Sequence, residues 1–121
     1  MKYQDDNVRY ELIIDNNKLK VAFFGKSTMP GTDAFIDAIE KEVQRQGTSV
    51  LRILMDLRGL TNIPLRVQIR MSKWLLRIKN DIEMVIVLGG GRVAKALAKG
   101  ARMSNVSFFD LEEPALAHFK G

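Results

Sequence analysis

The chain has 121 residues, with no cysteine, one histidine and a net charge of +5 at pH 7. This length suits one domain whose core is large enough to fold without a disulfide or a metal. The lack of cysteine excludes a disulfide framework and thiolate metal sites, and a lone histidine excludes paired-histidine metal motifs. We therefore expect a single domain over residues 1–121 with no cofactor.

The apolar segments are short. The longest run made only of aliphatic residues or methionine, Met84 to Leu88, is far below the roughly 20 residues that a membrane-spanning helix needs. The first seven residues contain no apolar stretch of the kind that signal peptides carry. These features predict that the protein has no transmembrane segment and is cytoplasmic.

The chain is expected to begin with a β-hairpin. Apolar and polar residues alternate over 8–14 and again over 19–25, which is typical of strands with one buried face. Between them, residues 15–18 read Asp-Asn-Asn-Lys, and Asn and Asp tolerate the left-handed backbone of a tight turn. The first of these strands is expected at or near an edge of the sheet.

The rest of the chain is expected to alternate helices with strands. Thr32, Pro64 and Asp110 favour helix starts, and Gly47 favours a helix end. The expected elements are a helix over 33–46, a strand over 50–56, a helix over 64–80, a strand over 84–88, a helix over 92–103, a strand over 106–109 and a short terminal helix. The order ββαβαβαβα predicts an α/β fold with a mixed, mostly parallel sheet of about five strands and right-handed helical crossovers.

A glycine-rich turn follows the strand over 84–88. Residues 89–94 match the G-x-G-x-x-A pattern of dinucleotide-binding turns. The chain has no room for the second half of a dinucleotide site, so we favour two simpler interpretations. The segment is a tight turn, or the amides of Gly90 and Gly91, beside Arg92 and Lys95, hold a phosphate or carboxylate at the helix start.

The helix over 64–80 is expected to carry a basic stripe. Arg66, Arg70, Lys73 and Arg77 recur at a spacing that places them on one helix face. An apolar stripe that should face the core lies beside it, and consists of Val67, Met71, Trp74 and Ile78. Ile69 and Leu76 flank the basic stripe and are expected to be exposed. Between residues 66 and 102 there are nine bases and two acids, and the next helix repeats the basic spacing.

Two interpretations of this basic surface stay open. In the first it is a solvated helix face, and in the second it binds an anionic partner such as an acidic protein or a lipid headgroup. Nucleic acid is the least favoured partner, because exposed aromatic residues for base stacking are not evident.

Residues 53–63, Ile-Leu-Met-Asp-Leu-Arg-Gly-Leu-Thr-Asn-Ile, resemble the signature of the STAS family, which includes anti-sigma-factor antagonists and the cytoplasmic domains of sulphate transporters. The element order and the last third of the chain are similar to the SpoIIAA-like branch, which is grouped with SEC14-type lipid-binding domains. The resemblance implies a STAS-like fold and a binding module that performs no chemistry. Its antagonists carry a phosphorylated Ser at the start of the following helix, where this chain has Pro64-Leu65-Arg66-Val67 and no hydroxyl.

We therefore expect a non-enzymatic binding or regulatory domain that docks a protein partner or a small anionic ligand. The residues expected to bind are Thr61, Asn62, Arg66, Arg70, Lys73, Gly90, Gly91, Arg92 and Lys95. A lipid or small-molecule carrier of SEC14 type and an enzyme of unrecognised type remain as alternatives. The hairpin edge, with exposed Ile69 and Leu76, leaves a homodimer open.

Overall fold

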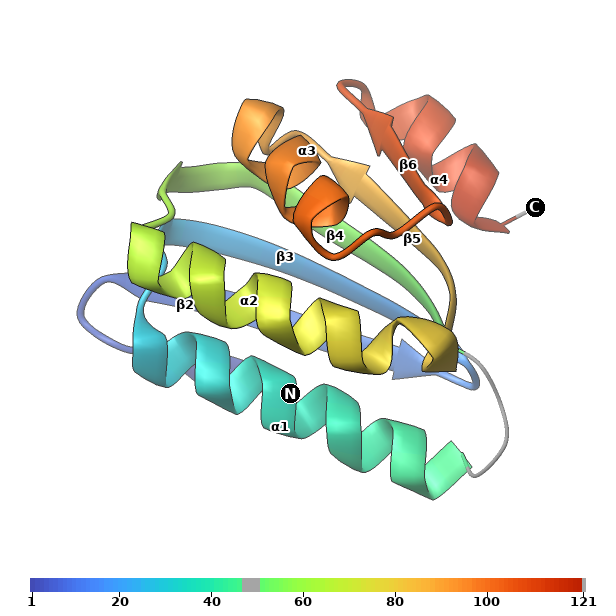
Figure 1. Cartoon of the computed structure of the whole chain (residues 1–121), viewed down its shortest axis with the longest axis horizontal. Helices are drawn as coiled ribbons and strands as arrows, with labels where there is room; N and C mark the ends of the chain where they lie inside the picture. The colour runs from blue at the N-terminus through green and yellow to red at the C-terminus, as the bar shows by residue number, and fades with distance from the viewer. Residues whose placement is uncertain (47–50, 121) are drawn as a thin grey trace.

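A six-stranded sheet with helices on both faces forms the core of the computed structural model, which describes residues 1–46 and 51–120 (Figure 1). The elements are β1 (Lys2–Gln4), β2 (Val8–Asp15), β3 (Lys18–Lys26), α1 (Met29–Gln46), β4 (Leu51–Asn62), α2 (Leu65–Ile78), the 3₁₀ turn η1 (Lys79–Asp81), β5 (Ile82–Leu88), α3 (Gly91–Gly100), β6 (Val106–Phe109) and α4 (Glu112–Lys120). The α/β class and the alternating order are confirmed.

The strands lie in the sheet in the order in which they occur in the chain, from β1 to β6. β1, β2 and β3 pair antiparallel, and the pairs from β3 to β6 are parallel. The hairpin is confirmed, and Asn16 adopts a left-handed φ of 54° in its turn. The expected number of about five strands was one short, because β1 has three residues and is too short to show an alternating pattern. β1 also covers the edge that the first hairpin strand was expected to leave open.

β4 is longer than the sequence predicted. The strand was expected to end at residue 56 and to give way to a loop over 57–64, but it continues to Asn62. Leu57 is buried against the core, and Gly59 lets the neighbouring strand approach closely. A Cβ at Gly59 would lie 2.6 Å from the Phe23 carbonyl oxygen, so this glycine serves strand packing and not a turn.

Several helix and strand ends also differ from expectation. α1 begins at Met29, not after Thr32, because the Thr28 hydroxyl accepts a hydrogen bond from the Gly31 N–H at 3.1 Å. Thr32 instead lies inside the helix and donates its hydroxyl to the Thr28 carbonyl at 2.7 Å. α3 ends at Gly100, and α2 gives way to η1 after Ile78. The expected stop at Gly47 lies outside the described residues.

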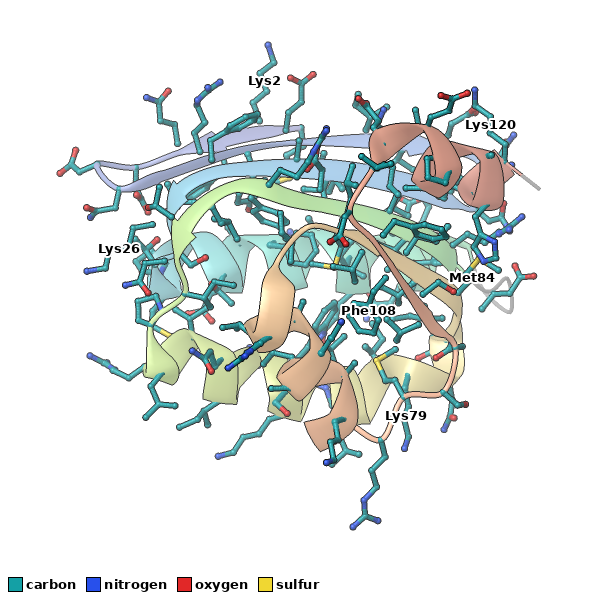
Figure 2. The ribbon with its side chains drawn as sticks, turned by 90° about the horizontal axis from the view of Figure 1, so that it is seen from above. Lys2, Lys26, Lys79, Met84, Phe108 and Lys120 are labelled. Atoms are coloured by element: carbon teal, nitrogen blue, oxygen red, sulfur yellow. The ribbon has the colours of Figure 1, made fainter. Side chains whose placement is uncertain are left out.

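Two apolar clusters hold the layers together. The larger one lies between the sheet and α1, α2 and α3. Within it the rings of Phe35 and Trp74 pack edge to face, with their centres 5.9 Å apart. The smaller one lies on the opposite face, where α4 covers β4, β5 and β6 (Figure 2). Its buried members are Leu54, Ile86, Leu88, Ala115 and Phe119. The helices of the first face therefore carry the larger share of the core.

Candidate functional site

α2 has one row of side chains that faces the core and other rows that face solvent. Its buried row, as expected, is Val67, Met71, Trp74 and Ile78. A second row, one residue earlier in each turn than the basic stripe, is exposed: Leu65 by 68%, Ile69 by 48% and Leu76 by 49%. Ser72 belongs to this row and lies against α3, since a Cβ at Gly100 would come within 2.9 Å of its hydroxyl oxygen. The outer surface of α2 is therefore apolar along the side that adjoins α3.

Among the described residues, contacts with α1 separate the basic stripe of α2 into two paired and two unpaired residues, which the helix spacing did not predict. Arg70 Nε lies 3.2 Å from Asp33 Oδ1, and Arg77 forms an ion pair with Glu40, so both arginines bridge to α1. Arg66 and Lys73 form no ion pair with any part of the chain that the structure describes. A signal was present in the sequence, because Asp33 and Glu40 are seven residues apart, and so are Arg70 and Arg77.

α3 continues the basic surface beside α2. Its bases Arg92, Lys95 and Lys99 are exposed, and Lys95 Nζ lies 6.0 Å from the centre of the Phe108 ring. Neither α2 nor α3 contains an Asp or a Glu. We define the α2–α3 surface as Leu65, Arg66, Ile69, Lys73 and Leu76 of α2 with Arg92, Lys95 and Lys99 of α3. It combines exposed apolar side chains with positive charge that no acid on these helices offsets.

The glycine turn before α3 is shaped by packing. Gly89, Gly90 and Gly91 have φ values of 79°, 80° and 54°. A Cβ at Gly90 would lie 2.8 Å from Leu57 Cδ1, whereas nothing lies within 4 Å of the equivalent position at Gly91. These contacts favour the tight-turn interpretation of the glycine motif, with Gly91 at its open side.

The remaining expected residues lie at the carboxyl end of β4. Thr61 and Asn62 are exposed in its last two positions. The Asn62 carbonyl accepts a hydrogen bond from the Ser27 N–H at 3.0 Å, which fastens the start of α1 to this strand. Arg66 follows in the first turn of α2, so Thr61 and Asn62 precede the α2–α3 surface along the chain by only a few residues. Lys73 lies two turns further, roughly 10 Å along the helix at 1.5 Å per residue.

An apolar cavity of about 60 Å³ lies beneath α2 near the carboxyl ends of β3 and β4. Its walls come from the sheet and from α1, α2 and α3, and they include the partly exposed residues Ser27, Thr28 and Ile63. Two of the hydroxyls around it have partners within the protein: Thr28 donates to Asp5 at 2.5 Å, and Tyr10 donates to the Gly31 carbonyl at 3.2 Å. Burial raises the pKa of Tyr10 to about 12, in keeping with its apolar surroundings.

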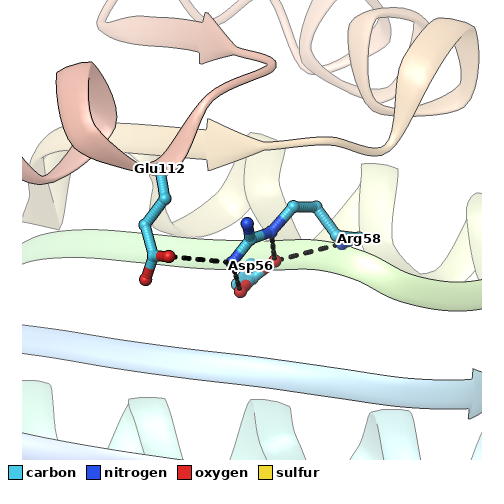
Figure 3. A network of polar contacts seen from close by, with 3 residues as sticks. All are labelled: Asp56, Arg58 and Glu112. Carbon is cyan, nitrogen blue, oxygen red and sulfur yellow. Dashed lines mark hydrogen bonds and ion pairs between the residues drawn. The ribbon is translucent and has the colours of Figure 1, made fainter.

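A charged network lies on the opposite face of the sheet (Figure 3). The Asp56 carboxylate accepts hydrogen bonds from Arg58 Nε at 3.0 Å, Arg58 Nη2 at 2.8 Å and the Arg58 backbone N–H at 3.1 Å. Arg58 also lies 3.6 Å from the Glu112 carboxylate, and so links β4 to α4. The Arg58 hydrogen bonds hold the pKa of Asp56 below its usual value. Asp56 is thus an ion-paired carboxylate and a poor general base.

Two further findings bear on the classes of function. The described residues contain no group of three or more His, Asp or Glu side chains that could hold a metal ion. None of the described helices is long and apolar enough to cross a membrane.

Comparison with known proteins gives matches in structure alone. No family model and no curated protein matches the sequence. A protein of the DUF3478 family from Shewanella loihica PV-4, described as uncharacterized and SpoIIAA-like in fold, matches with a TM-score of 0.68 and 17% identity over 98% of both chains. The unphosphorylated anti-sigma factor antagonist SpoIIAA matches with a TM-score of 0.67 and 13% identity, over 93% of this chain and 98% of that one.

An anti-sigma factor antagonist from Mycobacterium paratuberculosis matches with a TM-score of 0.61 and 14% identity, over 98% of both chains. These three matches cover nearly the whole of each chain, so the likeness includes the initial hairpin, the parallel strands and the terminal helix. The predicted fold is confirmed: the chain has the SpoIIAA-like fold of these structures.

Proposed function

We propose that this chain is a non-enzymatic docking module that binds an acidic segment of a partner protein on its α2–α3 surface. The observation that carries the proposal is the charge of the two helices, which hold seven bases and no acid. Two of the seven, Arg70 and Arg77, are paired with α1. The other five are exposed beside Leu65, Ile69 and Leu76, a combination that suits an acidic partner with apolar residues of its own.

The structural neighbours support a binding function. Two of them are described as anti-sigma factor antagonists, and antagonism of another factor is achieved by binding. The Asp56 carboxylate is engaged by Arg58 and is therefore not free to act as a general base. The cavity of about 60 Å³ is also too small for an acyl chain, so its size favours docking over a lipid carrier.

Docking by this chain is proposed to be independent of the phosphorylation switch that the resemblance implies for antagonists. Leu65 and Arg66 stand at the exposed start of α2, and neither side chain has the hydroxyl that such a switch phosphorylates. Phosphosite mapping after incubation with host lysate and ATP should find no stoichiometric phosphate on the adjacent Thr61. A phosphate there that blocks partner binding would contradict this part of the proposal.

The docking function is tested with charge-matched variants. Arg66→Gln/Lys73→Gln removes two unpaired charges from the α2–α3 surface, and Lys2→Gln/Lys120→Gln removes two charges from the side of the sheet that carries α4 (Figure 2). The probe is an immobilised nine-residue acidic peptide with one central leucine. We expect the first variant to bind roughly tenfold more weakly, the effect of about 1.4 kcal/mol, and the second to bind like the unsubstituted chain.

Equal loss in both variants would show a response to net charge alone and would refute the proposed surface. Parallel measurements with inorganic phosphate and with anionic phospholipid vesicles separate the other anionic ligands. Tighter binding to either of these than to the peptide would replace the protein partner by that ligand.

A further inference from the structure

The cavity beneath α2 adjoins the proposed docking surface. Val67 and Met71, on the buried side of α2, and Leu97 of α3 form part of its wall. Ile63, two residues before α2 begins, also lines it and is partly exposed, as are Ser27 and Thr28. These three partly exposed lining residues adjoin the first turn of α2, where Leu65 and Arg66 are exposed.

The lining of the cavity selects an apolar occupant. Most of the wall is aliphatic or aromatic, and it includes Phe23, Phe35, Met55, Leu57 and Leu60. The hydroxyls of Thr28 and Thr32 are used within the protein, by Asp5 and by the Thr28 carbonyl respectively. A charged group would lose its hydration here with only the Ser27 hydroxyl of the lining to replace it, at a cost of several kcal/mol.

The volume of the cavity limits how large its apolar occupant can be. An engineered apolar cavity of about 150 Å³ in another protein binds benzene, so about 60 Å³ suits an occupant smaller than that ring. The branched ends of leucine and isoleucine side chains are of this kind. An acyl chain of ordinary length would leave most of its carbons outside.

We propose that the cavity is the socket for one leucine or isoleucine side chain of the acidic partner that docks on the α2–α3 surface. This inference rests on the proposed function and specifies the partner's motif: one branched aliphatic residue flanked by acids that face Arg66 and Lys73. A single apolar anchor in a desolvated pocket, surrounded by weaker polar contacts, is the usual way in which small interfaces concentrate their affinity. Replacing the anchor by alanine is expected to weaken binding by roughly 30-fold.

The methionines of the chain allow a direct test. Met55 and Met71 line the cavity, whereas Met1 and Met84 do not, so their ¹³C-labelled methyl groups report on the cavity and on the rest of the molecule respectively. The first probe is xenon, which needs no substitution in the protein. The second and third are nine-residue acidic peptides of equal charge, one with a central leucine and one with a central alanine. The fourth is decanoate.

The proposal expects xenon and the leucine peptide to shift the Met55 and Met71 methyl signals while the Met1 and Met84 signals stay in place. It expects the alanine peptide to bind roughly 30-fold more weakly and to leave all four signals unchanged. Val67→Leu, which adds one methylene to the wall, should weaken the leucine peptide and reduce the xenon shifts. Arg66→Gln/Lys73→Gln should weaken both peptides by the same factor without changing the xenon shifts.

Three outcomes would overturn the socket. Equal affinity for the two peptides would leave docking standing and remove the anchor. Xenon shifts without binding of either peptide would show an open cavity and a failed docking function. Shifts of Met55 and Met71 with decanoate but not with the leucine peptide would assign the cavity to an aliphatic chain. The first two outcomes separate failure of the socket from failure of the proposed function.

Discussion

Arg70 and Lys73 lie one turn apart on α2 and carry the same charge, but they have different neighbours. Arg70 is paired with Asp33 of α1, and Lys73 has no acidic partner among the described residues. We predict that Arg70→Gln and Lys73→Gln affect stability and docking differently. Gln suits both positions because it is a good helix former that leaves the helix length and the apolar rows unchanged.

The expected magnitudes follow from the neighbours. Each of the two residues has two like-charged neighbours three or four positions away on α2, and such pairs repel by roughly 0.2–0.5 kcal/mol. Removing Lys73 relieves this repulsion and should raise the free energy of unfolding by about 0.5 kcal/mol. Removing Arg70 relieves the same amount but also loses the pair with Asp33. That pair is 34% and 55% exposed, and exposed pairs contribute roughly 0.2–1 kcal/mol.

The two variants should therefore differ by roughly 0.2–1 kcal/mol, or about 1–4 °C in Tm for a chain of this size. Urea and thermal unfolding at low salt measure the difference, and Asp33→Asn, alone and combined with Arg70→Gln, isolates the ion pair. At high salt the difference should shrink, because exposed charges are screened. Docking to the acidic peptide should weaken more in Lys73→Gln than in Arg70→Gln, because Lys73 is the charge left free for a partner.

The reasoning would be refuted by a Lys73→Gln variant that unfolds at a lower temperature than the unsubstituted chain. It would also be refuted by additive effects of Arg70→Gln and Asp33→Asn, since two groups that interact give a non-zero coupling energy in such a cycle.

Two further predictions concern positions described above. Gly90→Ala should lower the free energy of unfolding by more than about 2 kcal/mol, because its Cβ would lie 2.8 Å from Leu57 and its φ is 80°. Gly91→Ala, with open space around it, should lower the same quantity by only about 1–2 kcal/mol, and urea unfolding measures both. Hydrogen bonds from Thr28, Asn7 and Val8 lower the pKa of Asp5 from 3.8 to about 2. A carboxylate whose pKa is lowered in the folded state stabilises the fold at pH values above its unfolded pKa, and this stabilisation is lost as the pH falls toward 2. In an acid titration, Asp5→Asn should therefore lose less stability between pH 4 and pH 2 than the unsubstituted chain.

Periodicity predicted the parts of the fold that depend on local pattern. Val8, Tyr10 and Leu12 alternate with polar residues because one face of β2 is buried, and that burial is what the structure shows. The sequence predicted an end to β4 at residue 56, where the apolar run stops, but the strand continues through Gly59, whose missing side chain leaves room for Phe23 and Phe24 on the next strand. Contacts of this kind depend on which strands become neighbours and are not encoded within a window of a few residues.

The candidate site shows the same limit. The basic face of α2 and the exposure of Ile69 and Leu76 follow from helix geometry and were predicted. The pairing of Arg70 and Arg77 depends on the offset between α1 and α2, which tertiary packing sets. The cavity could not be predicted, because it is the space left by side chains from eight separate segments of the chain.

Because the apolar cluster beneath α4 is small, we expect α4 to separate from the sheet at a lower free energy than the helices on the other face. Only Ala115 and Phe119 of α4 are buried in it, and the ion pair between Glu112 and Arg58 is exposed and weak. Loss of these contacts leaves the larger cluster beneath α1 and α2 intact. Backbone amides of α4 should thus exchange with deuterium through a local opening, far faster than those of β3 and β4, which exchange only when the whole domain unfolds.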